Sequence, residues 1–194
     1  ERCIESLENN TNYKNFEIII VDNNTDDDKT LEYYNSLDYE TIPYNTAFNF
    51  SKMNNLGVTK AHGDYILCLN DDTKALEPSW LTEMVSICEQ DDVGIVGAKL
   101  LHRNGTIQHA GAVFLKSGSG FHVFENIVEN EKGFFNLHNV IRNFSAVTGA
   151  CLLIKKSIFE KVGGYDDNFD LFYGDADLCL KTLNNNLHVI YTPF

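Results

Sequence analysis

The sequence contains the stretch Ile66-Leu67-Cys68-Leu69-Asn70-Asp71-Asp72-Thr73, in which an apolar run stops at two adjacent carboxylates. The apolar part predicts a buried strand, so the two acids are expected where that strand meets solvent. In open α/β sheets, ligands bind beyond the carboxyl ends of the strands, and hard divalent cations carrying phosphate substrates are held by one or two carboxylates. The stretch favours a metal and nucleotide site, although a polar turn that closes a strand explains it equally well.

Strand and helix patterns alternate on both sides of this stretch. Strands are predicted over 16–21, 65–70 and 93–97, and helices over 28–37, 50–61 and 78–89. Uninterrupted β-branched strands between helices indicate a parallel sheet with helices on both faces, as in doubly wound, Rossmann-like α/β folds. Longer strands with less helix are predicted over 105–115 and 145–154. The fold class is therefore α/β, with a mixed but mostly parallel central sheet.

Length and charge limit the classes of partner. The 194 residues, 43% of them hydrophobic, suffice for one domain with one core. With 15 basic and 28 acidic residues, the formal charge of −13 argues against nucleic acid or an anionic lipid surface as partner. An anionic ligand would need a metal ion. No apolar run approaches the ~20 residues of a membrane helix, so no transmembrane segment is expected in this chain.

The cysteines indicate the cellular compartment of the protein. Their number is odd, their spacing is wide, and two of them lie inside apolar strand-like runs. We expect them to be reduced core thiols of a cytoplasmic protein. The five are Cys3, Cys68, Cys88, Cys151 and Cys179.

A second acidic group lies near the end of the chain, in Phe172-Tyr173-Gly174-Asp175-Ala176-Asp177. Asp175 and Asp177 are expected at the start of a helix, where the helix dipole and free amides favour anions. Helix capping is the competing explanation, particularly for Asp177. The Gly-rich and then charged stretch 118–133 has no clear period and predicts a loop over the site.

Five blocks follow one another along nearly the whole chain in an order typical of one family. They are residues 13–25 followed by 49–57; Leu69 to Thr73; Gln108-His109-Ala110-Gly111; Val147 to Cys151; and Gly163 to Asp166 followed by Gly174 to Lys181. Together they resemble family 2 glycosyltransferases of the GT-A fold, in particular bacterial cell-surface polysaccharide enzymes of the O-antigen or rhamnan type.

The resemblance implies an inverting glycosyltransferase of the hexosyl- or rhamnosyltransferase type. It would move a sugar from a nucleoside-diphosphate sugar to a glycan or lipid-linked acceptor. Mn²⁺ or Mg²⁺ would stabilise the leaving diphosphate, and a carboxylate would remove the acceptor proton. By match to the family motifs, Asp72 would bind the metal with Asn70 beside it, where many relatives carry Asp. Asp71 would hold the ribose, and Asp175 would be the catalytic base.

Further site residues follow from the same resemblance. Asp22 and Asn23 match a nucleobase-binding position, and Lys52 and Asn55 are candidates for diphosphate or ribose contacts, although a solvated helix face explains Lys52 equally well.

Four residues are candidates for the acceptor site: Trp80, His109, Asp166 and Asp177. Trp80 could stack on an acceptor sugar or anchor its helix to the sheet. His109 could line the cleft or be a buried, hydrogen-bonded histidine. Asp166 matches a segment near the acceptor, and Asp177 is the more natural helix-start residue.

The chain ends depart from the family pattern. Relatives begin with an apolar strand that this chain lacks, and they continue to a metal-ligating histidine beyond residue 194. The resemblance therefore implies one catalytic domain, 1–194, truncated at both ends, with a nucleotide-binding half (1–104) and an acceptor and base half (105–194). We expect the isolated piece to be weakly active or inactive, a homodimer formed by strand exchange to be feasible, and any membrane attachment to lie in missing regions.

Two other classes of protein remain as alternatives. A sugar-nucleotide nucleotidyltransferase would also use an acidic metal site, but it usually carries a Gly-rich, basic N-terminal loop, which is absent here. A non-catalytic carbohydrate-binding module would have no need for Asp72 and Asp175 at one cleft. Nucleotide binding that depends on Mn²⁺ separates the transferase from the module.

Overall fold

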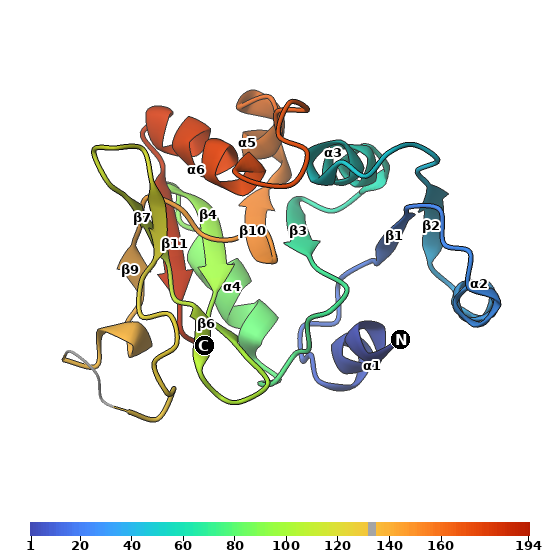
Figure 1. Ribbon diagram of the computed structural model, residues 1–194, viewed down its shortest axis with the longest axis horizontal. Coiled ribbons are helices and arrows are strands. Elements are labelled where there is room, and N and C mark those ends of the chain that lie inside the picture. Colours follow the sequence, from blue (N-terminus) through green and yellow to red (C-terminus); the bar gives the residue numbers. More distant parts are fainter. Residues whose placement is uncertain (132–134) are drawn as a thin grey trace.

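The computed structural model of the protein describes residues 1–131 and 135–194 (Figure 1). Its helices are α1 (Arg2–Asn9), α2 (Asp28–Ser36), α3 (Phe50–Lys60), α4 (Trp80–Cys88), α5 (Lys156–Lys161) and α6 (Gly174–Asn184), with a 3₁₀ turn η1 (Leu137–Asn139). Its strands are β1 (Ile19–Asp22), β2 (Glu40–Pro43), β3 (Tyr65–Leu69), β4 (Val93–Ala98), β5 (Leu100–Leu101), β6 (Ile107–His109), β7 (Ala112–Phe114), β8 (Gly120–His122), β9 (Arg142–Asn143), β10 (Cys151–Lys155) and β11 (His188–Thr192). Within the two described ranges, no helix is long and apolar enough to cross a bilayer.

The main sheet has five strands in the order β3-β10-β4-β11-β9. β10 runs antiparallel to both β3 and β4, β9 runs antiparallel to β11, and only β11 and β4 pair in parallel. The prediction of a mixed sheet is confirmed, but the prediction that it is mostly parallel is wrong. An apolar β-branched run indicates a buried strand and carries no information on its direction.

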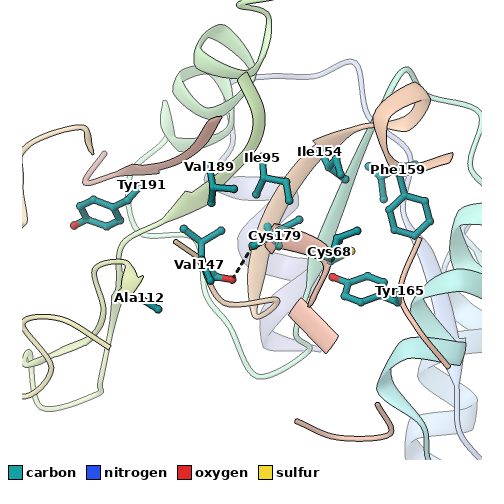
Figure 2. Close-up of a cluster of buried hydrophobic side chains, with 14 of the residues drawn as sticks. Cys68, Ile95, Ala112, Val147, Ile154, Phe159, Tyr165, Cys179, Val189 and Tyr191 are labelled. Carbon is teal, nitrogen blue, oxygen red and sulfur yellow. Dashed lines mark hydrogen bonds between the residues drawn. The ribbon is translucent and has the colours of Figure 1, made fainter. Parts of the chain in front are cut away.

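Helices cover both faces of this sheet, as predicted. Alternate residues of β10 enter different cores, since Leu152 and Ile154 pack with α5 and α6, while Cys151 and Leu153 pack with α4. This is the period of two expected for a strand buried on both sides. Figure 2 shows the first core, where Ile154 lies near residues of β4 and β11. All five cysteines are buried and free, as expected for core thiols.

β1 and β2 form a separate parallel pair. In the part of the chain that the structure describes, no ladder joins β1 to β3, and Figure 1 shows the two strands well apart. A cavity of about 1860 Å³ lies there, with residues of β1, β3 and α3 among its walls. β1 starts at Ile19, so the strand predicted from residue 16 is shorter than expected.

The region after residue 105 contains shorter strands than predicted. The expected strand over 105–115 consists of two short strands, β6 and β7, and β10 starts only at Cys151. β7 pairs with β8 as a hairpin, with Ala112 opposite His122 and Phe114 opposite Gly120. The predicted loop over 118–133 therefore includes a strand, while Lys132 and Gly133 lie outside the described residues.

The start of α3 fixes the loop that leads into α6. The Phe50 backbone N–H donates to the Asp170 carbonyl at 2.6 Å, and the Ser51 hydroxyl donates to the Phe169 carbonyl at 2.6 Å. The Asn49 side chain caps α3 through Lys52 N–H and also donates to the Asp167 carbonyl at 2.9 Å. The start of α3 therefore holds the segment 167–170, which lies more than a hundred residues later in the sequence and leads into α6.

Candidate functional site

The two acidic groups of the sequence meet at one short backbone segment, Gly149-Ala150. Asn70, at the end of β3, donates its backbone N–H to the Ala150 carbonyl at 3.0 Å. The Gly149 N–H donates to Asp175 Oδ2 at 2.8 Å. Consecutive residues thus connect the acidic turn after β3 to the first turn of α6. Asn70, Asp71 and Asp175 all line the same cavity.

Asp175 lies in the first turn of α6 and is half-buried. Its Oδ1 accepts the Ala176 N–H at 2.8 Å, so both carboxylate oxygens accept hydrogen bonds from backbone amides. Gly149 allows this close approach, because a Cβ on Gly149 would lie 2.9 Å from the Phe50 ring and 3.3 Å from Asp175 Cβ. The carboxylate is therefore held in one orientation at the cavity wall.

The acidic turn after β3 presents hard oxygen ligands to solvent. Asp71 and Asp72 are exposed, and neither carboxylate accepts a hydrogen bond from the described residues. Asp71 lines the cavity, whereas Asp72 lies one residue beyond its lining. Over residues 1–131 and 135–194, no three His, Cys, Asp or Glu side chains come together as a complete metal site. Mg²⁺-type cations commonly use one or two carboxylates with substrate phosphates and water, and this turn fits that ligand set.

Asp22 and Asn23 follow β1 and line the same cavity. Asp22 Oδ1 accepts from both the backbone N–H and the hydroxyl of Thr25. The Asn23 amide donates to the carbonyls of Tyr44 and Thr46, both at 2.9 Å, and so ties the β1 end to the segment after β2. These bonds shape the cavity wall at the position predicted for the nucleobase.

Lys52 and Asn55 are the residues predicted to contact the diphosphate or ribose. Both are on α3, but neither lines the cavity. The Asn55 amide donates to the Tyr165 carbonyl and to Asp167 Oδ1, both at 2.9 Å, and its Oδ1 accepts the Tyr165 N–H at 3.0 Å. Asn55 thus braces the loop before α6, and its contact with diphosphate or ribose stays a prediction. Lys52 is exposed, in agreement with the alternative of a solvated helix face.

Three of the predicted acceptor residues have structural partners instead. Trp80 is 8% exposed, packs in the core under α4 and donates from Nε1 to the Thr11 hydroxyl at 3.0 Å. Asp166 Oδ1 accepts from the Asn168 backbone and side chain, and Asp177 pairs with Lys181 along α6 at 2.7 Å. Neither aspartate lines the cavity. Trp80 does line the cavity, and the partners of all three residues agree with the alternatives of helix anchor and helix-start residue, so their acceptor contacts stay predictions.

His109 is also a structural residue, because it is 0% exposed and does not line the cavity. Its ring contacts His122 of β8, which does line the cavity and which the sequence analysis had not singled out as a site residue. No sequence signal identified this pairing, since it depends on how the β7–β8 hairpin folds over β6.

The opening of the cavity carries exposed apolar side chains. Phe172 is 70% exposed and its neighbours Leu171 and Tyr173 are 55% and 59% exposed, and all three line the cavity directly before α6. Tyr173 adopts a left-handed backbone conformation with φ of 66°, which is uncommon for a bulky residue. This apolar rim lies next to Asp175 in the chain.

The cavity lining is acidic. Its charged residues among those described are carboxylates such as Asp22, Asp71 and Asp175, and no Lys or Arg is present in it. Its two histidines are His62, which pairs with Glu17 at 3.0 Å, and His122. A phosphate group entering this cavity would face uncompensated negative charge unless a cation accompanied it.

Comparisons with known proteins agree with this geometry. Residues 1–163 match the family described as "Glycosyl transferase family 2". The chain is 36% identical over 197 residues to the protein y4gI of Sinorhizobium fredii, covering 98% of this chain and 22% of that protein. It is 34% identical over 193 residues to the O-antigen biosynthesis protein RfbC of Myxococcus xanthus, covering 97% of this chain and 15% of that protein.

A solved structure shares the fold. The crystal structure of GalNAc-T7 with UDP, GalNAc and Mn²⁺ superposes with a TM-score of 0.76 at 15% identity, covering 98% of this chain and 39% of that one. The present chain thus spans less than a quarter of the two curated relatives above, and only part of the structural neighbour.

Proposed function

Because this chain belongs to glycosyl transferase family 2, we propose that its cavity transfers a sugar from a nucleoside-diphosphate sugar to a glycan or lipid-linked acceptor, with inversion at the anomeric carbon. The biological setting in this proposal is the synthesis of a cell-surface polysaccharide. The name of the relative RfbC, an O-antigen biosynthesis protein, supports that setting.

One observation carries the proposal, namely the two hydrogen bonds that join Gly149 to Asp175 and Ala150 to Asn70 at the cavity wall. Inverting transfer needs a leaving-group site and a base within one substrate length of each other. Asn70 N–H to Ala150 and Gly149 N–H to Asp175 join the acidic turn and the α6 carboxylate through adjacent residues. Acids at two unrelated surface sites would not be expected to be connected through adjacent residues of one backbone segment.

On the donor side, the acidic turn and the end of β1 have separate tasks. Asp71 would hold the ribose, and Asp72 and Asn70 would hold Mn²⁺ or Mg²⁺, which when bound stabilises the negative charge that develops on the leaving diphosphate. Among residues 1–131 and 135–194, no Lys or Arg lines the cavity to do this instead. Asp22 and Asn23, held by Thr25, Tyr44 and Thr46, would contact the nucleobase.

On the acceptor side, Asp175 would remove the proton from the attacking hydroxyl. Its two backbone hydrogen bonds fix the carboxylate before substrate arrives, so little reorganisation is needed during the reaction. The apolar rim of Leu171, Phe172 and Tyr173 is placed to contact the acceptor.

The base is tested by Asp175→Asn in an active, full-length form of the protein, with Asp177→Asn as the matched control. Asn keeps the shape of the side chain and can still accept the Gly149 N–H, but it cannot take a proton. We expect turnover to fall by about 10²–10⁴-fold with nucleotide affinity unchanged. The control removes the partner of Lys181, two residues further along the same helix, and should leave turnover within about twofold of wild type.

Near-normal turnover in Asp175→Asn would contradict the assignment of the base. An equal loss in both variants would show damage to α6 rather than loss of a proton acceptor. Thermal unfolding of both variants distinguishes these cases.

The donor side is tested by calorimetry with UDP, GDP and dTDP, each with and without Mn²⁺. We expect binding of at least one nucleotide to require the metal, and Asp72→Asn to weaken that binding by about tenfold or more. Sugar binding without any nucleotide binding would instead identify a carbohydrate-binding module.

A further inference from the structure

A pair of histidines connects the inside of the protein to the cavity wall. His109, at the end of β6, and His122, at the end of β8, have ring centroids 4.8 Å apart and rings inclined at 77°. Their Nδ1 atoms are 3.1 Å apart. His109 is 0% exposed, whereas His122 is exposed and lines the cavity. A short contact between two ring nitrogens requires that one carries a proton and the other does not.

The partners of His109 determine which nitrogen carries the proton. His109 Nε2 accepts the Gly111 N–H at 3.2 Å and the Thr148 N–H at 3.3 Å, so this nitrogen is unprotonated. The single proton of a neutral His109 is therefore on Nδ1 and is donated to His122 Nδ1. Burial, with a smaller contribution from His122, lowers the pKa of His109 to about 3 and keeps the ring neutral.

The same hydrogen bonds then determine the state of His122. Because His122 Nδ1 accepts from His109, the proton of a neutral His122 is on Nε2. Nε2 has no partner within the described residues. The β7–β8 hairpin thus presents one N–H donor in a cavity whose lining, in the part of the chain that the structure describes, contains no Lys or Arg.

His109 also touches the segment that holds the carboxylate of α6. The Thr148 N–H donates to His109 and the next N–H along the chain, that of Gly149, donates to Asp175 Oδ2. One peptide unit therefore separates the support of His122 from the support of Asp175. His122 and Asp175 reach the cavity from different elements, β8 and α6. The same backbone segment, Thr148-Gly149, contacts His109 behind the one and Asp175 itself.

We propose that His122 is a substrate-binding residue whose Nε2–H donates a hydrogen bond to a hydroxyl oxygen of a neutral acceptor sugar, and that His109 is the positioning residue that sets its tautomer. The inference rests on the proposed glycosyl transfer. The acidic lining argues for a neutral acceptor group, since a carboxylate or phosphate of the acceptor would be repelled by the aspartates that line the same cavity.

The tautomers can be observed directly, without any activity. Long-range ¹H–¹⁵N correlation spectra of the imidazole rings at about pH 8 should show His109 protonated at Nδ1 and His122 protonated at Nε2. His109→Gln keeps an acceptor for Gly111 and Thr148 but gives His122 no proton. The His122 signals should then shift toward a mixture of tautomers. A wild-type His122 protonated at Nδ1, or an unchanged His122 spectrum in His109→Gln, would overturn the proposal.

Substrate contact is tested with two variants that each mimic half of the ring. His122→Asn keeps an acceptor near Nδ1, and His122→Gln keeps a donor near Nε2. The acceptor probes are p-nitrophenyl hexosides and 6-deoxyhexosides, with p-nitrophenyl glucuronide as the charged counterpart. His122→Asn should raise KM for the neutral acceptors about five- to tenfold and leave KM for the sugar nucleotide unchanged. His122→Gln should lie between it and wild type.

His188→Asn is the control, since His188 lies at the start of β11 outside the cavity lining and faces Asp92. It should leave both KM values unchanged. Normal transfer with an unchanged acceptor KM in His122→Asn would overturn the inference alone, as would a wild-type preference for the glucuronide. These assays use the full-length protein that contains this chain, and no transfer by its wild-type form to any acceptor would overturn the proposed function together with the inference.

Discussion

His109 makes the stability of the protein sensitive to mild acid. Its pKa is lowered to about 3 in the folded state by burial, against 6.5 for an ordinary histidine. Above pH 6.5 the ring is neutral in both states. As the pH falls from 6.5 toward 3, the unfolded chain binds a proton that the folded chain does not, so the free energy of unfolding decreases by at most about 1.4 kcal/mol per pH unit.

His109→Gln removes this titration and is the matched variant. Between pH 7 and pH 5, denaturant unfolding should show a larger loss of stability for wild type than for the variant, although the variant is less stable at pH 7. Parallel curves for the two proteins would show that His109 does not titrate in this window.

Single residues differed in how far the sequence could place them. Asp71 and Asp175 line one cavity as expected, because Asp71 follows a strand and Asp175 begins a helix, and both boundaries are visible in the sequence. The partners of Asn55 could not be predicted, because its amide bonds to the Tyr165 segment, more than a hundred residues away. The role of Gly149 was invisible, because it consists of a backbone N–H and the absence of a Cβ.

Close packing between strand and loop leads to a prediction for Gly97. A Cβ on this β4 residue would lie 2.4 Å from Val147 Cβ, far inside contact distance, and Val147 is almost completely buried. Gly97→Ala should therefore destabilise the protein by about 1–3 kcal/mol. It should also reduce activity, because Val147 precedes Thr148 and the Gly149 support of Asp175.

Gly63→Ala, in the turn between α3 and β3, is the control for Gly97→Ala. A Cβ on Gly63 would lie 3.4 Å from the Tyr65 carbonyl oxygen, an ordinary contact. Its effect should stay within about 0.5 kcal/mol in chemical denaturation. Equal effects of the two substitutions would mean that β4 and the 147 segment are less tightly packed than the structure indicates.

Most elements before residue 104 were predictable, because periodicity, caps and turns are local signals. Asn49 at the start of α3 and Asp27 before α2 both cap their helices through side-chain oxygens. The direction and neighbours of β10 were not predictable. They depend on β10 pairing with β3 and β4 at once, and the long connection before β10 leaves no local signature of that choice.

The separation of β1–β2 from the main sheet predicts uneven protection across the molecule. β4 has six buried residues and partners on both edges, while β1 is half-buried and, among the described strands, pairs with β2 alone. In hydrogen–deuterium exchange, peptides covering β1 and β2 should exchange at least about tenfold faster than those covering β4. Equal protection would indicate that β1 is held by a partner strand in solution.

The two halves expected from the sequence are interleaved at the scale of the whole molecule. β10, from the second half, lies between β3 and β4 of the first. The acidic turn and Asp175 reach one cavity through this arrangement, since β10 begins at Cys151, directly after Gly149 and Ala150.

The central place of β10 has a consequence for synthesis on the ribosome. β3 and β4 have both been translated by residue 98, yet the strand that separates them starts at residue 151. At ~5–20 residues per second, the nascent chain carries two unpaired apolar strands for a few seconds before their common neighbour emerges. Such a chain is a natural client for chaperones that bind extended apolar segments, and slow codons in this interval would prolong its exposure.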